Sequence, residues 1–161
     1  MLFRSVEPLA WDAAGRLYSL WADTTGMQLA RSADRGTTWT RWRIAEPHGV
    51  SFYAFLIARG RGELAATWFS TTTRTREDMQ WHVARVDLGD GDAAPRVIES
   101  SPRALESWRR YPGEGETLYR DPGGEYTGLS FLRDGGLGVV SPIQNAAANR
   151  MGFTWWRFDV R

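Results

Sequence analysis

The sequence predicts an all-β protein built from repeated antiparallel sheets. Short runs rich in aromatic and β-branched residues, such as 16–23, 63–70 and 79–88, alternate with turn residues. No convincing helical period appears inside these runs. Nine tryptophans in 161 residues favour strands in the same way. Three segments (7–23, 54–70 and 127–142) also resemble one another, which indicates an internal repeat.

The repeat consists of a strand, a glycine turn and a second strand. When the three segments are aligned, the same residue type recurs at equivalent positions, which we call columns. The columns are Gly15, Gly62 and Gly135; Leu9, Leu56 and Leu129; and Leu17, Leu64 and Leu137, with Trp21 matching Trp68. A third strand is expected after each segment, at 27–32, 79–88 and 150–160. In the first repeat a fourth strand is expected at 40–45.

Four antiparallel strands in about 40 to 50 residues are typical of a β-propeller blade. We therefore expect one domain, 1–161, of about three blades at 7–46, 50–99 and 126–161, forming a partial or half propeller. Residues 99–125 read as a loop insertion, in which 102–110 is compatible with a short helix. Such a loop is either a functional lid or a tolerated insertion.

The turn between the third and fourth strands of the first repeat has an ordered pattern, SADRGTTW at 32–39. Ser32 and Asp34 can bond backbone N–H groups of their own turn. Gly36 supplies the positive φ that a tight turn favours, and Trp39 helps to restart an extended strand. The pattern predicts a hairpin turn bonded by its own side chains.

This stretch resembles the Asp box of the sialidase and BNR-repeat β-propellers, and residues 8–45 resemble one BNR repeat. At the level of blades, nearly the whole chain looks like the C-terminal part of such a propeller, although one full Asp box occurs. The resemblance implies that Ser32, Asp34, Gly36 and Trp39 are structural, with the tryptophan packed into the hydrophobic layer.

The resemblance also implies what a hydrolytic site would contain. A sialidase uses a tyrosine nucleophile with a glutamate to take its proton, an aspartate acid/base and an arginine cluster for the sugar carboxylate. Tyr126, which opens a strand followed by Asp134 and Gly135, matches the nucleophile's context, and Glu116 is the candidate base. Tyr126 could equally fill the centre of a propeller.

Candidate substrate-binding residues are Arg59, Arg120 and Arg133, near strand ends, and Tyr53, which occupies the slot of Tyr126 in the second repeat. Two parts of the sialidase pattern are absent or unplaced. Residues 2–8 lack the N-terminal arginine motif, and no position is assigned to the acid/base aspartate.

Composition narrows the classes of partner. A net charge of +1 argues against nucleic-acid binding, and the absence of cysteine excludes disulfides and thiolate metal sites. His48 and His82 alone cannot form a zinc site, and Asp87, Asp90 and Asp92 are expected to form a plain turn. We expect no metal, no cofactor and no membrane span. No signal peptide is expected in these residues, although related propellers are often secreted, so the compartment stays open.

The leading functional hypothesis is a sialidase-like propeller module that interacts with a glycan, possible ligands being sialylated. One alternative is an active sialidase-type glycoside hydrolase, completed by further blades or by dimerisation. The other is a non-catalytic scaffold with a protein partner. Three blades would leave large apolar faces open. Either the chain belongs to a longer propeller, or two copies form a six-bladed ring, or, least favoured, a fourth blade lies in 99–125.

Overall fold

The computed structural model is all-β and consists of three antiparallel sheets. It describes residues 8–73, 78–99, 103–104, 127–145 and 150–159, and this part contains no helix. Sheet A comprises β1 (Leu9–Trp11), β2 (Leu17–Asp23), β3 (Gly26–Ser32) and β4 (Thr40–Ala45). Sheet B comprises β5 (Val50–Arg59), β6 (Glu63–Thr71), β7 (Gln80–Asp87), β8 (Arg96–Glu99) and β9 (Arg103–Ala104). Sheet C comprises β10 (Gly128–Phe131), β11 (Leu137–Asn145) and β12 (Arg150–Phe158).

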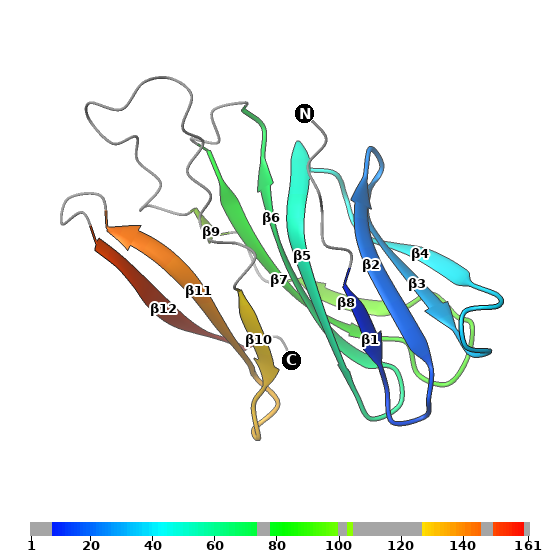
Figure 1. Cartoon of the computed structure of the whole chain (residues 1–161). Helices are drawn as coiled ribbons and strands as arrows, with labels where there is room; N and C mark the ends of the chain where they lie inside the picture. Colours follow the sequence, from blue (N-terminus) through cyan, green and yellow to red (C-terminus); the bar gives the residue numbers. More distant parts are fainter. Residues whose placement is uncertain (1–7, 74–77, 100–102, 105–126, 146–149, 160–161) are drawn as a thin grey trace.

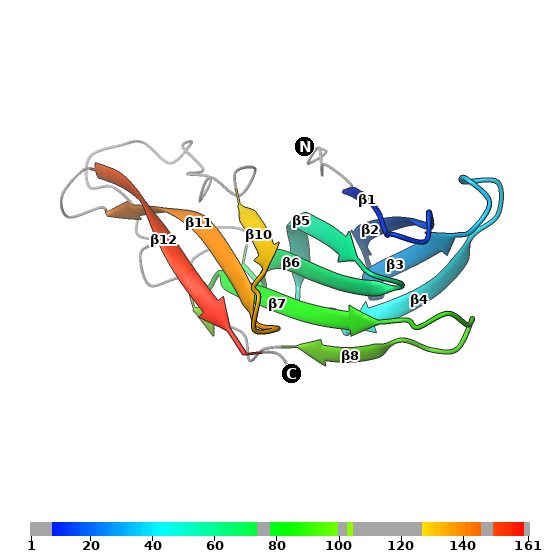
Figure 2. The ribbon, with the colours of Figure 1, turned by 90° about the horizontal axis from the view of Figure 1, so that it is seen from below.

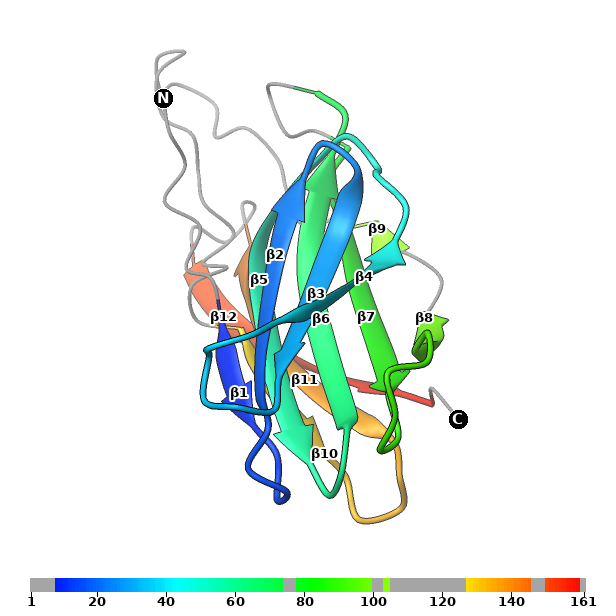
Figure 3. The same cartoon turned by 90° about the vertical axis from the view of Figure 1, so that its right-hand side faces the viewer.

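The sheets stand side by side in chain order, with sheet B between the other two (Figures 1 and 2). One hydrophobic cluster fills the space between sheets A and B, and a second fills the space between B and C. Seen from the side of sheet A, β2 and β3 lie in front of β5, β6 and β7 (Figure 3). Sheet B is therefore covered on both faces, which explains why β6 reads as a nearly continuous apolar run with eight of its nine residues buried.

The first hairpin of each sheet has the same register. Leu9 pairs with Ser19, Leu56 with Ala66, and Leu129 with Val139. Residues that are equivalent in the sequence alignment of the repeats therefore also occupy equivalent positions in the strand pairing.

The turns of these three hairpins share a glycine in the left-handed region. The turn glycines Gly15, Gly62 and Gly135 have φ of 77°, 80° and 88°. In the outer two turns this glycine follows a type I turn and donates its amide to Asp12 or Leu132. The middle turn differs, because Gly60 also has a positive φ, of 56°, and the Gly62 amide donates to Asp12 of sheet A. The glycine column marks a backbone conformation that other residues adopt only at a cost.

A β-bulge at Tyr53 changes which face of sheet B the side chains of β5 reach. The register shifts between Phe52 and Phe55, and Tyr53 has a φ of 51°. One extra residue reverses the alternation of a strand. Phe52 consequently packs in the cluster facing sheet C, whereas Ala54 and Leu56 pack in the cluster facing sheet A.

The all-β prediction is confirmed. Arg103 and Ala104, in the stretch compatible with a short helix, instead form the short strand β9, which pairs with Trp81 and Gln80 of β7. Edge pairing to β7 satisfies backbone groups that an isolated helical turn would leave to water. The other residues of that stretch lie outside the described residues, as do 100–102 and 105–125 of the expected insertion. No helix in the described part is long and apolar enough to cross a membrane.

Candidate functional site

The residues expected to form a sialidase-like site lie partly outside the described part of the chain. Tyr126, Glu116 and Arg120 lie outside the described residues. Tyr53 lies near the beginning of β5 and Arg59 at its end, a separation of roughly 20 Å along an extended strand. Arg133 is exposed in the β10–β11 turn. Of the expected ligands that are described, Tyr53 and Arg59 are therefore far apart, and the site as a whole stays a prediction.

Arg59 is paired with other groups of the protein, although its side chain is 38% exposed. Its guanidinium donates to both carboxylate oxygens of Glu63, at 2.6 and 2.7 Å, and lies 4.1 Å from the centre of the Phe131 ring in sheet C. This ion pair is the largest cause of the lowered pKa of the Glu63 carboxyl. Arg59 thus joins the ends of sheets B and C rather than presenting a free guanidinium.

The 32–39 turn is bonded by its own side chains. Ser32 Oγ accepts from the Gly36 amide at 2.7 Å. The Asp34 carboxylate accepts from the Thr38 hydroxyl at 2.7 Å and the Thr38 amide at 2.8 Å. These bonds, with the Thr38 hydroxyl first, lower the pKa of Asp34 to about 2. The carboxylate is held ionised inside its own turn, which suits a structural role.

Trp39 differs from the expectation for this turn. Its Nε1 donates to the carbonyl of Gly36 at 3.0 Å, but its ring belongs to neither hydrophobic cluster. The ring is half-buried and lines a hollow on the outer face of sheet A. The bond to Gly36 holds the indole against its own turn and away from the layer between sheets A and B.

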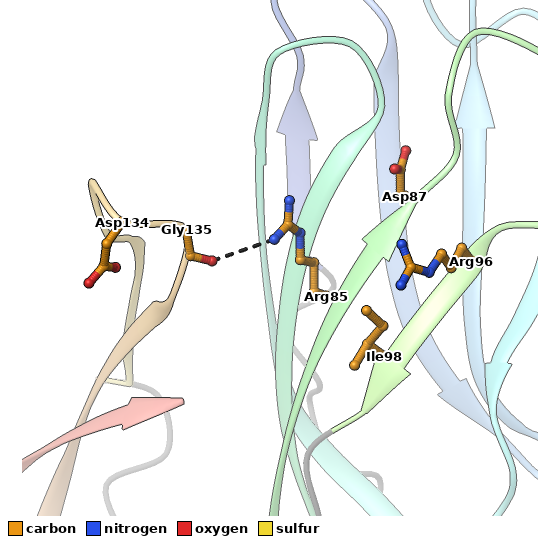
Figure 4. A pocket seen from close by; sticks show the side chains of 6 residues that line it. All are labelled: Arg85, Asp87, Arg96, Ile98, Asp134 and Gly135. Carbon is orange, nitrogen blue, oxygen red and sulfur yellow. Dashed lines mark hydrogen bonds between the residues drawn. The ribbon is translucent and has the colours of Figure 1, made fainter. Parts of the chain in front are cut away.

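A polar cleft lies where sheet B meets the first turn of sheet C (Figure 4). It has a volume of about 350 Å³, and its lining residues are Arg85, Asp87, Arg96, Ile98, Asp134 and Gly135. The first four come from β7 and β8, and the last two from the β10–β11 turn. Side chains of both charges thus surround one apolar side chain, Ile98.

Arg85 holds the two walls of this cleft together. One terminal nitrogen donates to Glu63 at 2.5 Å, and the other to the Gly135 carbonyl at 3.5 Å, the dashed line in Figure 4. Asp134 is fixed on the opposite wall, where the Gly136 amide and then Arg157, at 2.6 Å, lower the pKa of its carboxyl. Both groups are positioned by the protein before any ligand arrives.

Arg96 and Asp87 are the less constrained pair. They face each other across the β7–β8 register, and both are exposed. Within the described residues Arg96 has no ion pair, whereas Asp87 accepts from the Gly89 amide at 3.0 Å. The described lining contains no serine, cysteine, tyrosine or histidine. The cleft can therefore offer charged donors and acceptors to a ligand, and the groups in its described lining that could act as nucleophiles are the carboxylates of Asp87 and Asp134.

Ser70, His82 and Glu99 form a hydrogen-bonded chain that no motif in the sequence predicts. Ser70 Oγ lies 2.7 Å from His82 Nε2, and His82 Nδ1 lies 2.8 Å from Glu99 Oε1. The imidazole stacks on Trp68 with ring centres 5.1 Å apart. This is the residue order of a hydrolytic triad.

Burial decides what this chain of bonds can do. Ser70 has no exposed surface, and His82 is 4% exposed. A nucleophile must touch its substrate, so the three residues instead clamp β6, β7 and β8 together. The three residues belong to three different strands, β6, β7 and β8. Only the strand register, in which Trp68 pairs with His82, could have shown that they are neighbours.

Neither comparison with known proteins returned a match: no protein-family model matches the chain, and no curated protein matches it. Within the described residues, no three histidine, aspartate or glutamate side chains are grouped to hold a metal ion. Function is therefore argued from the geometry of the clefts and faces.

Proposed function

We propose that the chain forms three blades of a sialidase-like, Asp-box β-propeller. Three features support this interpretation: the equal registers of the first hairpins, the chain-order stacking of the sheets, and the self-bonded turn between β3 and β4. Meandering four-stranded sheets packed face to face are the arrangement of propeller blades. The described part of sheet C contributes its first three strands.

We further propose that the module is non-catalytic and binds an acidic carbohydrate in the cleft between sheets B and C. The observation that carries this proposal is the group of charged side chains beside Ile98, in which ion pairs hold Arg85 and Asp134 while Arg96 has none within the described residues. Planar guanidinium and carboxylate groups meet sugar hydroxyls with directed hydrogen bonds, and a free guanidinium pairs with a sugar carboxylate. Arg96 is the residue assigned to that carboxylate, and Asp87 and Asp134 accept from hydroxyls.

Calorimetric titration with sialyllactose, using lactose as the neutral comparison, tests the proposal. Arg96→Ala is expected to weaken sialyllactose binding by roughly tenfold or more, because a hydrogen bond to a charged group contributes about 1.5–3 kcal/mol. Arg61→Ala is the matched control, since its guanidinium is 71% exposed and lies outside the cleft lining. Equal affinity for lactose, or unchanged binding by Arg96→Ala, would contradict the assignment.

An aryl sialoside offered to the same protein separates binding from hydrolysis. The proposal expects no release of the aryl group. Release that is abolished by Tyr126→Phe would instead favour the glycoside hydrolase alternative.

A further inference from the structure

The outer face of sheet A carries exposed apolar side chains that no other sheet of the described part covers. Leu9 is 63% exposed and Trp11 is 54% exposed, both on β1. A hollow of about 370 Å³ lies beside them, lined by Leu9, Ser19, Trp21, Ala30, Trp39 and Arg41. Large aromatic and aliphatic side chains gathered on one face of a soluble protein mark an interaction surface.

Comparison of equivalent positions in the three repeats shows what kind of surface covers this face in the other two sheets. The residue equivalent to Leu9 is Leu56 in sheet B, which is 6% exposed and packs against sheet A. In sheet C it is Leu129, which packs against the cluster shared with sheet B. The same position is thus covered by the preceding sheet twice and is left open once.

Two further positions repeat this pattern. Leu64 and Leu137 have no exposed surface, whereas their equivalent in sheet A, Leu17, is half-buried. Trp68 is 2% exposed, whereas its equivalent Trp21 is half-buried. The outer face of sheet A therefore carries the residues of a sheet-to-sheet contact without the preceding sheet.

Sheet C is open on its opposite face. Trp155 is 57% exposed and pairs with Val140, which is only half-buried. The equivalents of Val140 are Leu20 and Thr67, which are 0% and 1% exposed because the next sheet covers them. In the part of the chain that the structure describes, no sheet follows sheet C, just as none precedes sheet A.

We infer that a second copy of the chain covers both faces. The outer face of sheet A packs against the outer face of sheet C in the partner copy, and the reciprocal contact closes a six-bladed ring. A single kind of contact then covers both open faces and continues the A-to-B and B-to-C packing. A net charge of +1 gives two copies little mutual repulsion. The inference rests on the proposed propeller stacking and is independent of the carbohydrate proposal.

Light scattering on a sizing column gives the first test. We expect a mass of about 36 kDa, twice the 18.2 kDa of one chain, at micromolar concentration. A monomer would overturn the inference and would leave the face to another protein or another sheet. A mass that keeps rising with concentration would also overturn it, because a head-to-tail contact that fails to close forms open chains.

Two variants distinguish this interface from simple face-to-face pairing. Trp11→Asp alters sheet A, and Trp155→Asp alters sheet C; each is expected to lower the mass to that of a monomer. Val50→Asp is the control, because Val50 is equally exposed, at 58%, but begins β5 in the middle sheet. Dissociation by Trp11→Asp alone would indicate that two A faces pair and would overturn the A-to-C contact.

Mixing the two variants gives a further readout. One intact A-to-C contact re-forms between a Trp155→Asp chain and a Trp11→Asp chain. The mixture is therefore expected to contain heterodimers that neither variant forms by itself. A mixture that stays monomeric while the control remains dimeric would argue against the contact. Sialyllactose titration of the same samples reports separately on the carbohydrate cleft.

Discussion

The carboxylate of Asp12 joins sheet A to sheet B at the level of a single side chain. It accepts five hydrogen bonds, from the backbone or side-chain groups of Ala14, Arg16, Tyr18 and Gly62. The bond from the Gly62 amide, at 2.9 Å, crosses to the next sheet. Burial raises the pKa of Asp12, but the bonds, led by the Arg16 amide, outweigh it and leave the pKa lowered.

Replacing Asp12 should therefore be costly. We expect Asp12→Ala to lower the free energy of unfolding by about 3–5 kcal/mol, because the largely buried Arg16 loses its counter-charge. Asp12→Asn should cost less but still clearly destabilise, since its amide nitrogen faces N–H donors. Urea denaturation measures both.

Asp90→Asn is the control for this measurement, because Asp90 is 70% exposed and lies 3.5 Å from Arg16. It should cost less than about 0.5 kcal/mol, as surface pairs do. Equal losses for Asp12→Asn and Asp90→Asn would show that the buried network contributes little.

At the scale of the element, the three first hairpins each place a glycine with positive φ at the same repeat position but differ in surroundings. A Cβ added at Gly15 or Gly135 would meet nothing within 4 Å, whereas one added at Gly62 would lie 2.6 Å from the Gly89 carbonyl oxygen. The three positions therefore all require a left-handed residue, and the middle one also requires space.

Alanine at each turn glycine separates the two requirements. Gly15→Ala and Gly135→Ala should each cost about 1–2 kcal/mol, the penalty for a left-handed residue that carries a side chain. Gly62→Ala should cost substantially more, because the backbone of the β7–β8 loop must move. Chemical denaturation of the three variants checks the order, and three equal losses would show that the Gly89 contact yields freely.

At the scale of the whole molecule, several carboxylates are held ionised by the folded structure. The pKa values of Asp12, Asp34, Glu63, Asp78 and Asp134 are all lowered. A carboxyl with a lowered folded-state pKa stabilises the protein above its unfolded pKa, and this contribution disappears as the pH falls toward the folded pKa.

Stability should accordingly fall in acid. The free energy of unfolding should change little between about pH 7 and 5, and should then decrease below about pH 4, near the unfolded pKa of Asp and Glu. Urea midpoints measured across this range give the curve. A flat curve down to about pH 2.5, close to the folded-state value of about 2 for Asp34, would contradict these lowered pKa values.

Periodic features of the fold could be predicted from the sequence, whereas the candidate cleft could not. The glycine and leucine columns depend on positions a fixed distance apart along the chain, so they predicted the hairpins. The cleft joins Arg96 on β8 to Asp134 in a turn of the next sheet, and only the stacking of sheets brings those residues together. The bulge at Tyr53 escaped prediction because nothing in the local pattern demands a positive φ at a tyrosine.

The ion pair of Arg59 is a feature that the repeat alignment could have predicted. The place of Arg59 near a strand end favours a substrate ligand, but in the repeat alignment it is equivalent to Asp12, and Glu63 is equivalent to Arg16. The same two positions carry an ion pair in both sheets. Comparing columns for charge as well as for hydrophobicity would have assigned Arg59 to packing between sheets.

The acidic and basic residues of that shared ion pair occur in opposite order in the two sheets, so the sheets are not interchangeable. In sheet A the acid, Asp12, comes first and accepts a hydrogen bond from the Gly62 amide in the turn of sheet B. In sheet B the arginine comes first, and the neighbouring Arg85 donates to a carbonyl in the turn of sheet C. The two boundaries between sheets are therefore held by different groups. A rearranged chain that put sheet C directly after sheet A would lose both sets of bonds.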